Sequence, residues 1–166
     1  ANNKEDAHEE PTIKRSRSHD YVAKEVQNVR ENVGAIEVAN FSKHEFIGPD
    51  ARKFLDHVLA GKLPKPGRIS LSPMLTYKGK LYGDLTVACL SENEFMIFGS
   101  GAAQEMHRRW FETHLSKFNL KYSNRSDDFH GISIAGPKSR QLFQKLVKED
   151  VSNENFKFRD IKKMFV

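Results

Sequence analysis

With 166 residues, 38% of them hydrophobic, the chain can bury a core and corresponds to one ordinary domain or to part of a larger one. Its formal net charge of +5 comes from 27 Lys and Arg against 22 Asp and Glu mixed along the sequence, which disfavours a dedicated nucleic-acid module. No apolar run approaches the roughly 20 residues of a membrane span, and the N-terminus lacks the apolar stretch of a signal peptide, so we expect a soluble, intracellular protein.

The first half of the sequence changes from a polar tail to an amphipathic helix and then to a strand. Residues 1–20 are polar without apolar periodicity and predict a tail or linker. Apolar residues spaced three and four apart predict a packing helix over residues 21–32, and alternation from Ala35 predicts a strand that bends near residues 41–42. Gly48-Pro49-Asp50 ends this strand and starts a second helix, for which Gly61 is the expected cap.

The second half predicts an antiparallel sheet with further helices. Residues 69–75 and 81–90 read as strands around a turn at 77–80, and residues 94–98 as a third strand. Gly99-Ser100-Gly101 leads into a helix over residues 102–115. After a polar loop we expect a short strand at 131–135, a Gly136-Pro137 turn and a helix over residues 138–148.

Two segments share one plan. Residues 46–55 and 134–143 both read as strand, Gly-Pro, two residues, a basic residue and an amphipathic helix. Chance similarity is the alternative explanation. The plan predicts an α+β fold in which duplicated strand-helix units and further helices pack on antiparallel sheets.

Cysteine and histidine suggest no redox or metal chemistry. The lone Cys89 cannot form an internal disulfide, and its apolar strand predicts a buried thiol in a reducing compartment rather than a nucleophile. None of the seven histidines forms a closely spaced pair with a nearby acid, so no metal site is expected.

Asp84 is the unusual residue, because it lies in an otherwise apolar strand. A buried carboxylate there must be hydrogen-bonded, protonated or facing a ligand. One interpretation is a group that binds an amine or accepts its proton. The other is an ion pair with Arg68, Arg108 or Arg109. Gly99-Ser100-Gly101 also leaves two interpretations open, backbone N–H groups that bind a polar ligand or a tight turn that caps a helix.

Several motifs in order carry a family resemblance. They include Val33-Gly34-Ala35-Ile36-Glu37-Val38, Gly48-Pro49-Asp50-Ala51 and Gly83-Asp84-Leu85-Thr86-Val87. From residue 11 to residue 166 the chain resembles the N-terminal part of the folate-binding domain of the glycine cleavage T-protein (aminomethyltransferase) family. It is most similar to the C-terminal folate-binding part of dimethylglycine and sarcosine dehydrogenases, through Gly99-Ser100-Gly101, Arg109-Trp110-Phe111-Glu112 and Ile132-Ser133-Ile134-Ala135-Gly136-Pro137.

The resemblance implies a tetrahydrofolate site with Asp84 as its catalytic carboxylate, which would orient the folate amine and take up its proton. A flavin domain would oxidise an N-methyl amine to an iminium, and folate would capture the carbon as 5,10-methylenetetrahydrofolate. Phe41 replaces a family Met and Leu71 a family Tyr, while Gly99 and Ser100 stand where the family has an Asn. The implied folate-binding positions are Phe41, Leu71, Met74, Tyr82, Gly99 and Ser100.

The same resemblance sets expectations for partners. We expect residues 21–166 to be a partial folate-binding domain, with FAD only in an upstream domain or a partner subunit, in a bacterial cytoplasm or a mitochondrial matrix. The N-methyl amine stays open. The rivals are a non-catalytic regulatory or interaction module of the same fold, and a stand-alone aminomethyltransferase or folate-dependent demethylase.

Overall fold

The computed structural model describes residues 11–165, in which short helices alternate with antiparallel strands. In chain order these are α1 (His19–Glu31), β1 (Gly34–Glu37), β2 (Ser42–Ile47), α2 (Ala51–Val58), β3 (Arg68–Leu75), β4 (Leu81–Ser91), β5 (Glu94–Gly99), α3 (Gln104–His114), β6 (Lys121–Asn124), β7 (Ile132–Ala135) and α4 (Ser139–Gln144). Short 3-10 helices, Gly101–Ala103 and Leu115–Lys117, flank α3.

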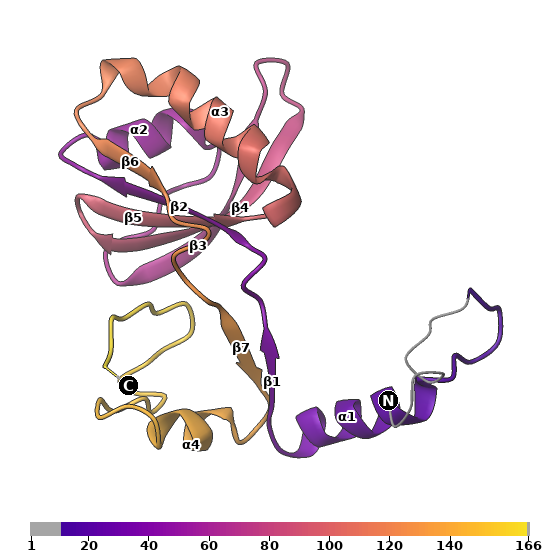
Figure 1. The fold of residues 1–166 in the computed structure, drawn as a ribbon. Helices are drawn as coiled ribbons and strands as arrows, with labels where there is room; N and C mark the ends of the chain where they lie inside the picture. The colour runs from indigo at the N-terminus through magenta and orange to yellow at the C-terminus, as the bar shows by residue number, and fades with distance from the viewer. Residues whose placement is uncertain (1–10, 166) are drawn as a thin grey trace.

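The strands form two antiparallel sheets. The larger has five strands in the order β3-β4-β5-β2-β6, and the smaller pairs β1 with β7 (Figure 1). The expected hairpin is confirmed, because β3 and β4 pair around a turn in which Gly79 has a φ of 72°. The strand expected to bend near residues 41–42 is two strands, β1 and β2, which belong to different sheets.

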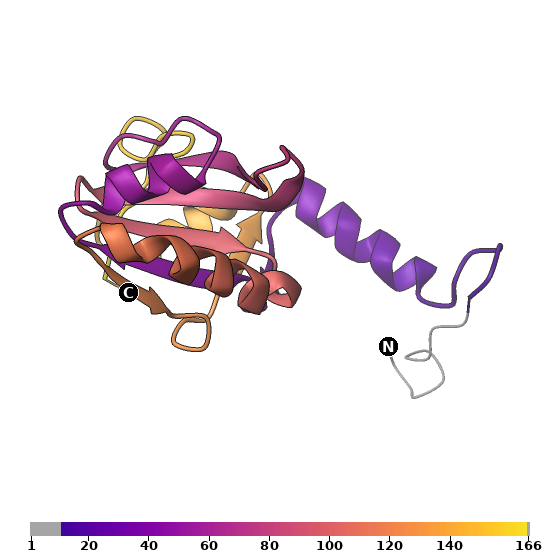
Figure 2. The same cartoon turned by 90° about the horizontal axis from the view of Figure 1, so that it is seen from above.

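The core lies on one face of the five-stranded sheet, beneath α2 and α3 (Figure 2). Strand alternation supplies Phe46, Leu85, Val87, Phe95 and Ile97 to this face, all without exposed surface. The helices add their apolar sides from above: Phe54, Leu55 and Val58 of α2, and Phe111 of α3. Burial of these side chains holds the helical layer on the sheet.

Two linkers join the sheet to the β1-β7 ribbon, residues 38–41 on the way in and 125–131 on the way back (Figure 1). They contact each other, since the Val38 N–H donates to the Gly131 carbonyl at 2.7 Å. Helix α1 extends away from the sheet in both views (Figures 1 and 2). It was expected to pack, but it has no buried residue, and Val22 and Val26 are exposed.

The two similar segments form similar structures. Gly48 and Gly136 both have positive φ, 149° and 117°, where each strand turns into its helix. The basic residue of each segment then binds backbone carbonyls farther along the chain. Arg52 donates to the Pro64 carbonyl at 3.2 Å, and Arg140 to the Val151 carbonyl at 2.5 Å. The duplicated strand-helix plan is therefore present in the structure.

Other local expectations differ from the structure. The loop expected after α3 contains β6, which pairs with β2. Gly61 does not cap α2, which ends at Val58, and the Gly61 N–H instead donates to Ser72 Oγ at 2.9 Å. Helix α4 ends at Gln144 rather than near 148. Residues 11–18 contain no helix or strand, and the rest of the predicted tail lies outside the described residues.

Candidate functional site

A cavity of about 620 Å³ lies against the face of the five-stranded sheet that points away from α2 and α3, here called the open face. That volume is in the range of small-molecule sites. Strand residues of the open face form its floor, and the two linkers and the segment at 161–163 form its walls. The lining residues are Val38, Phe41, Lys43, Thr86, Leu90, Met96, Phe98, Phe129, His130, Gly131, Ile161, Lys162 and Lys163.

The lining is mainly apolar, and its only charged groups are basic. Three phenylalanines suit a flat aromatic ligand. The lining contains no Asp or Glu. Lys163 forms an ion pair with Glu94 at 2.7 Å, and His130 lies 3.7 Å from Glu37. The cavity therefore suits an aromatic ligand of neutral or negative charge.

Asp84 lies on the open face beside this cavity. In β4, Leu85 and Val87 point into the core, so Asp84 and the lining residue Thr86 point the other way. Asp84 is exposed in the described part of the chain. The burial expected for it from the apolar strand is therefore wrong. The apolar character of the strand comes from its other face.

The carboxylate of Asp84 has no ion pair in the described part of the chain. Arg68 pairs instead with Asp160, and Arg108 pairs with Glu105 at 2.8 Å and Glu112 at 2.7 Å. Arg109 donates no side-chain hydrogen bond to Asp84 either, within the same residues. The fold leaves this acid available to a ligand.

Two of the predicted folate-binding residues share the open face with Asp84. Phe41 is 48% exposed and forms part of the cavity wall. Leu71 is 68% exposed and lies opposite Thr86 in the β3-β4 pair, while Asp84 lies opposite Pro73. Paired residues of antiparallel strands have side chains on the same face. The structure therefore brings Phe41, Leu71 and Asp84 to one side of the sheet.

Ser100 follows β5 directly and is exposed. Its carbonyl accepts the Ala103 N–H at 3.1 Å, which begins the 3-10 helix before α3. The Ser100 hydroxyl makes no cap hydrogen bond to that helix. The turn explains the backbone at this position, and the hydroxyl remains available.

Met74, Tyr82 and Gly99 lie on the core side, away from the cavity. Met74 is fully buried, and a β-bulge between Met74 and Leu75 turns Tyr82 toward Trp110 of α3, with ring centroids 4.7 Å apart. A Cβ at Gly99 would lie 3.1 Å from both Ser42 Oγ and His107 Nδ1. Glycine is needed here by the packing of α3 on the sheet.

Most residues of the cavity lining were not predicted from the sequence. Thr86 and Phe98 occupy the solvent-side positions of the predicted strands, so strict alternation in β4 and β5 could have indicated them. Phe129 and Ile161 lie outside regular structure and carry no such periodic signal. Lys43 is 3% exposed, although lysine is a residue type that is rarely buried.

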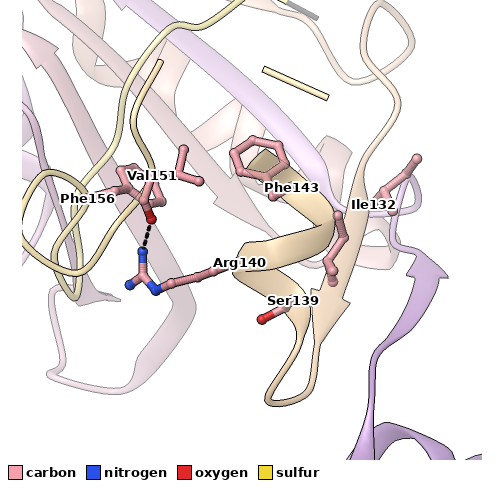
Figure 3. Close-up of a pocket in the computed structure, with 7 residues that line it drawn as sticks. Ile132, Ser139, Arg140, Phe143, Val151 and Phe156 are labelled. Carbon is pink, nitrogen blue, oxygen red and sulfur yellow. Dashed lines mark hydrogen bonds between the residues drawn. The ribbon is translucent and has the colours of Figure 1, made fainter. Parts of the chain in front are cut away.

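A second pocket, of about 320 Å³, lies beside α4 (Figure 3). Ile132, Phe143, Val151 and Phe156 surround it, and Arg140 points from α4 to the Val151 carbonyl. None of the predicted site residues lines this pocket. Its arginine fixes the local backbone, as Arg52 does in the first unit.

Cys89 is buried in β4, as expected. Burial raises the pKa of its thiol, which outweighs the neighbouring Arg52 guanidinium. A raised pKa lowers the thiolate fraction at neutral pH.

Residues 11–165 contain no helix long and apolar enough to cross a membrane.

Comparison with known proteins gives a family match and related enzymes. The family described as the GCVT N-terminal domain matches residues 4–166. Mouse mitochondrial dimethylglycine dehydrogenase is 34% identical over 161 residues, which cover 95% of this chain and 18% of that protein. The sarcosine oxidase alpha subunit of Rhizobium meliloti is 35% identical over 144 residues, covering 82% of this chain and 14% of that protein. The chain thus spans less than one fifth of either relative.

A solved structure agrees at the level of the fold. The glycine cleavage system aminomethyltransferase T from Bartonella henselae superposes with a TM-score of 0.66 at 20% sequence identity, over 75% of this chain and 35% of that chain. The α+β architecture predicted from the strand and helix pattern is therefore confirmed.

Proposed function

Because the chain belongs to the GCVT N-terminal domain family, we propose that it is the folate-binding portion of an N-methyl amine dehydrogenase, with its tetrahydrofolate site on the open face. The likeness to dimethylglycine dehydrogenase over nearly the whole chain supports this branch over a stand-alone aminomethyltransferase. The whole reaction transfers a one-carbon unit from an oxidised N-methyl amine to tetrahydrofolate: bonds form from that carbon to folate nitrogens, its bond to the substrate nitrogen breaks, and the demethylated amine leaves.

The main support for this proposal is a carboxylate that has no ion pair in the described residues and lies next to an aromatic-lined cavity. Asp84 lies one open-face position from Thr86, which lines the cavity. The lining residues Phe41, Phe98 and Phe129 provide flat apolar surface for a pterin or benzoyl ring. These residues fit tetrahydrofolate by shape and polarity, and they include no acid that would repel its carboxylates.

Tetrahydrofolate supplies the amine nitrogen that takes up the one-carbon unit. In our proposal, Asp84 accepts a hydrogen bond from that amine, orients it, and receives its proton as the new C–N bond forms. A carboxylate in this position also stabilises the positive charge on nitrogen. The apolar lining keeps water away from the reactive iminium carbon.

Oxidation of the amine belongs to a different part of the enzyme. We propose that a flavin-dependent domain or subunit carrying FAD delivers the one-carbon unit, in a mitochondrial matrix or a bacterial cytoplasm. The likeness to a protein named as one subunit of sarcosine oxidase supports this division. Neither a nucleic acid nor a membrane has a role in the proposal.

The test compares Asp84→Asn with Asp56→Asn in the full-length protein. Asp56 is an exposed acid on α2, on the other side of the sheet. We expect Asp84→Asn to lower tetrahydrofolate-coupled formation of methylenetetrahydrofolate by roughly 10²- to 10⁴-fold, the usual contribution of a positioned acid or base. Dye-linked amine oxidation should stay at the wild-type rate. Asp56→Asn should change neither activity.

Equal folate-coupled activity of Asp84→Asn and the wild type would remove Asp84 from the mechanism. Absence of tetrahydrofolate binding to the wild type, measured by calorimetry, would favour the non-catalytic interaction module.

A further inference from the structure

Lys43 combines deep burial with a position in the cavity wall. It is 3% exposed, and it lies on the open face of β2, among the residues that line the cavity. A buried ammonium normally needs an anionic partner to offset its desolvation. Within residues 11–165, Lys43 forms no salt bridge. Backbone carbonyls surround it instead.

The ammonium group donates to carbonyls on both linkers. Nζ lies 2.8 Å from the Ala39 carbonyl and 2.8 Å from the Phe41 carbonyl, in the linker before β2. It lies 3.2 Å from the Ser126 carbonyl, in the linker after β6. These acceptors match the donor capacity of a lysine, so no N–H remains for a ligand. Lys43 therefore acts on the protein, not on a bound molecule.

The backbone of Lys43 reinforces the same connection. Its N–H donates to Ser126 Oγ at 2.9 Å, and its carbonyl accepts the Arg125 N–H at 2.8 Å. The Ser126 hydroxyl in turn donates to Asn124 Oδ1 at 2.6 Å. One residue thus joins the two segments that carry Phe41 and Phe129 to the cavity.

We propose that Lys43 is a positioning residue for the ligand cavity: its ammonium group holds Phe41 and the 126–131 segment in the geometry that receives the ligand. This inference rests on the proposed function for the identity of the ligand. Its structural part, the connection between the linkers, is independent of that identity.

The first test measures how fast the backbone amides of the two linkers exchange in the absence of ligand. Hydrogen-deuterium exchange is followed in the full-length protein for the wild type, Lys43→Met and Arg52→Met. Arg52 is the matched control, because it too is a cation that donates to a backbone carbonyl, but it lies away from the cavity. Lys43→Met should speed exchange several-fold in residues 38–41 and 125–131, while Arg52→Met leaves both linkers unchanged.

The second test asks whether Lys43 acts through Phe41. Tetrahydrofolate affinity is measured by calorimetry for Lys43→Met, Phe41→Ala and the double variant, below the melting temperature of each. Lys43→Met should weaken binding about tenfold, as a small misplacement of a positioning group can do. In the Phe41→Ala background the same substitution should add little, because the two changes remove one interaction.

Lys43→Arg replaces Lys43→Met if the latter does not fold, since it keeps the charge while its planar group cannot match the same three carbonyls. It should also speed linker exchange. Wild-type exchange in both linkers, or fully additive losses of affinity, would overturn the proposal. A wild type that binds no tetrahydrofolate would refute the proposed function and leave the exchange result to decide the connection.

Discussion

His44 of β2 and His107 of α3 are buried close together, with ring centroids 6.3 Å apart. His44 Nδ1 shares a hydrogen bond of 2.9 Å with the Tyr122 hydroxyl. Burial lowers the pKa of His44 to about 4, assisted by His107 and opposed by Glu105. Burial also lowers the pKa of His107. The folded protein therefore holds both rings neutral at pH 7.

The lowered pKa predicts loss of stability in mild acid. The unfolded chain binds a proton at His44 near pH 6.5, whereas the folded chain does so only near pH 4. The contribution of the neutral His44 ring to the free energy of unfolding is complete above pH 6.5 and disappears as the pH falls to about 4. We expect a loss of roughly 2 to 4 kcal/mol over this interval, measured by urea unfolding across the pH range.

His44→Phe should flatten this part of the stability profile, because the titrating ring is gone. His57→Phe, which replaces an exposed ring on α2, is the matched control for exchanging a histidine for a phenylalanine. A profile that keeps its slope in His44→Phe would assign the acid sensitivity to other groups.

At the scale of elements, the two strand-helix units differ in how well their helices are covered. Phe46 and Leu55 of the first unit are fully buried. Their counterparts in the second unit, Ile134 and Phe143, line the open pocket beside α4. With less apolar burial, the second unit depends more on the hydrogen bonds from Arg140 to its following loop.

Removing that arginine should therefore loosen one unit only. We expect Arg140→Met to speed hydrogen-deuterium exchange several-fold over residues 139–152 while residues 42–58 keep their wild-type rates. Arg52→Met is the reciprocal variant and should affect the segment at 51–67. Faster exchange across both units in either variant would show that the units are not independent.

The success of sequence prediction varied with the kind of signal in each element. Strands β3, β4 and β5 were predictable because alternation and the Lys78-Gly79-Lys80 turn are local signals. Strand β6 was missed, since Lys121–Asn124 is polar and pairs with β2 only through the tertiary fold. Gly61 suggested a helix cap, but contact with Ser72 explains the glycine. Long-range packing decided both positions.

The candidate site was predictable to the extent that strand faces are. Phe41, Leu71 and Asp84 lie on the same side of the sheet, and their role in one ligand site stays a prediction. Met74 and Gly99 point into the core, because a motif marks positions along a strand without stating which face each residue occupies. The burial of Lys43 could not be predicted, since its acceptors lie on linkers without regular structure.

At the scale of the whole molecule, the five-stranded sheet is an insertion between β1 and β7. The chain leaves the ribbon after Glu37 and returns to it at Ile132, after completing the sheet, α2 and α3. The sheet contains the main core, whereas β1 has only exposed or half-buried residues. Unequal burial of this kind gives unequal local stability.

We expect hydrogen-deuterium exchange to separate these two parts. Amides of β4, β5 and β2 should be the most protected, and amides of β1 and β7 should exchange before them, through opening of the ribbon alone. Equal protection in both sheets would show that the ribbon and the inserted sheet unfold as one unit.

The same insertion has a consequence during protein synthesis. Strand β1 leaves the ribosome about one hundred residues before β7, and closing so long a loop carries a large entropic penalty unless the intervening chain is already folded. The five-stranded sheet must therefore form while β1 is still an unpaired strand, whose backbone N–H and C=O groups have no partner strand. Nascent chains stalled before residue 132 should accordingly be the species that chaperones bind at this segment.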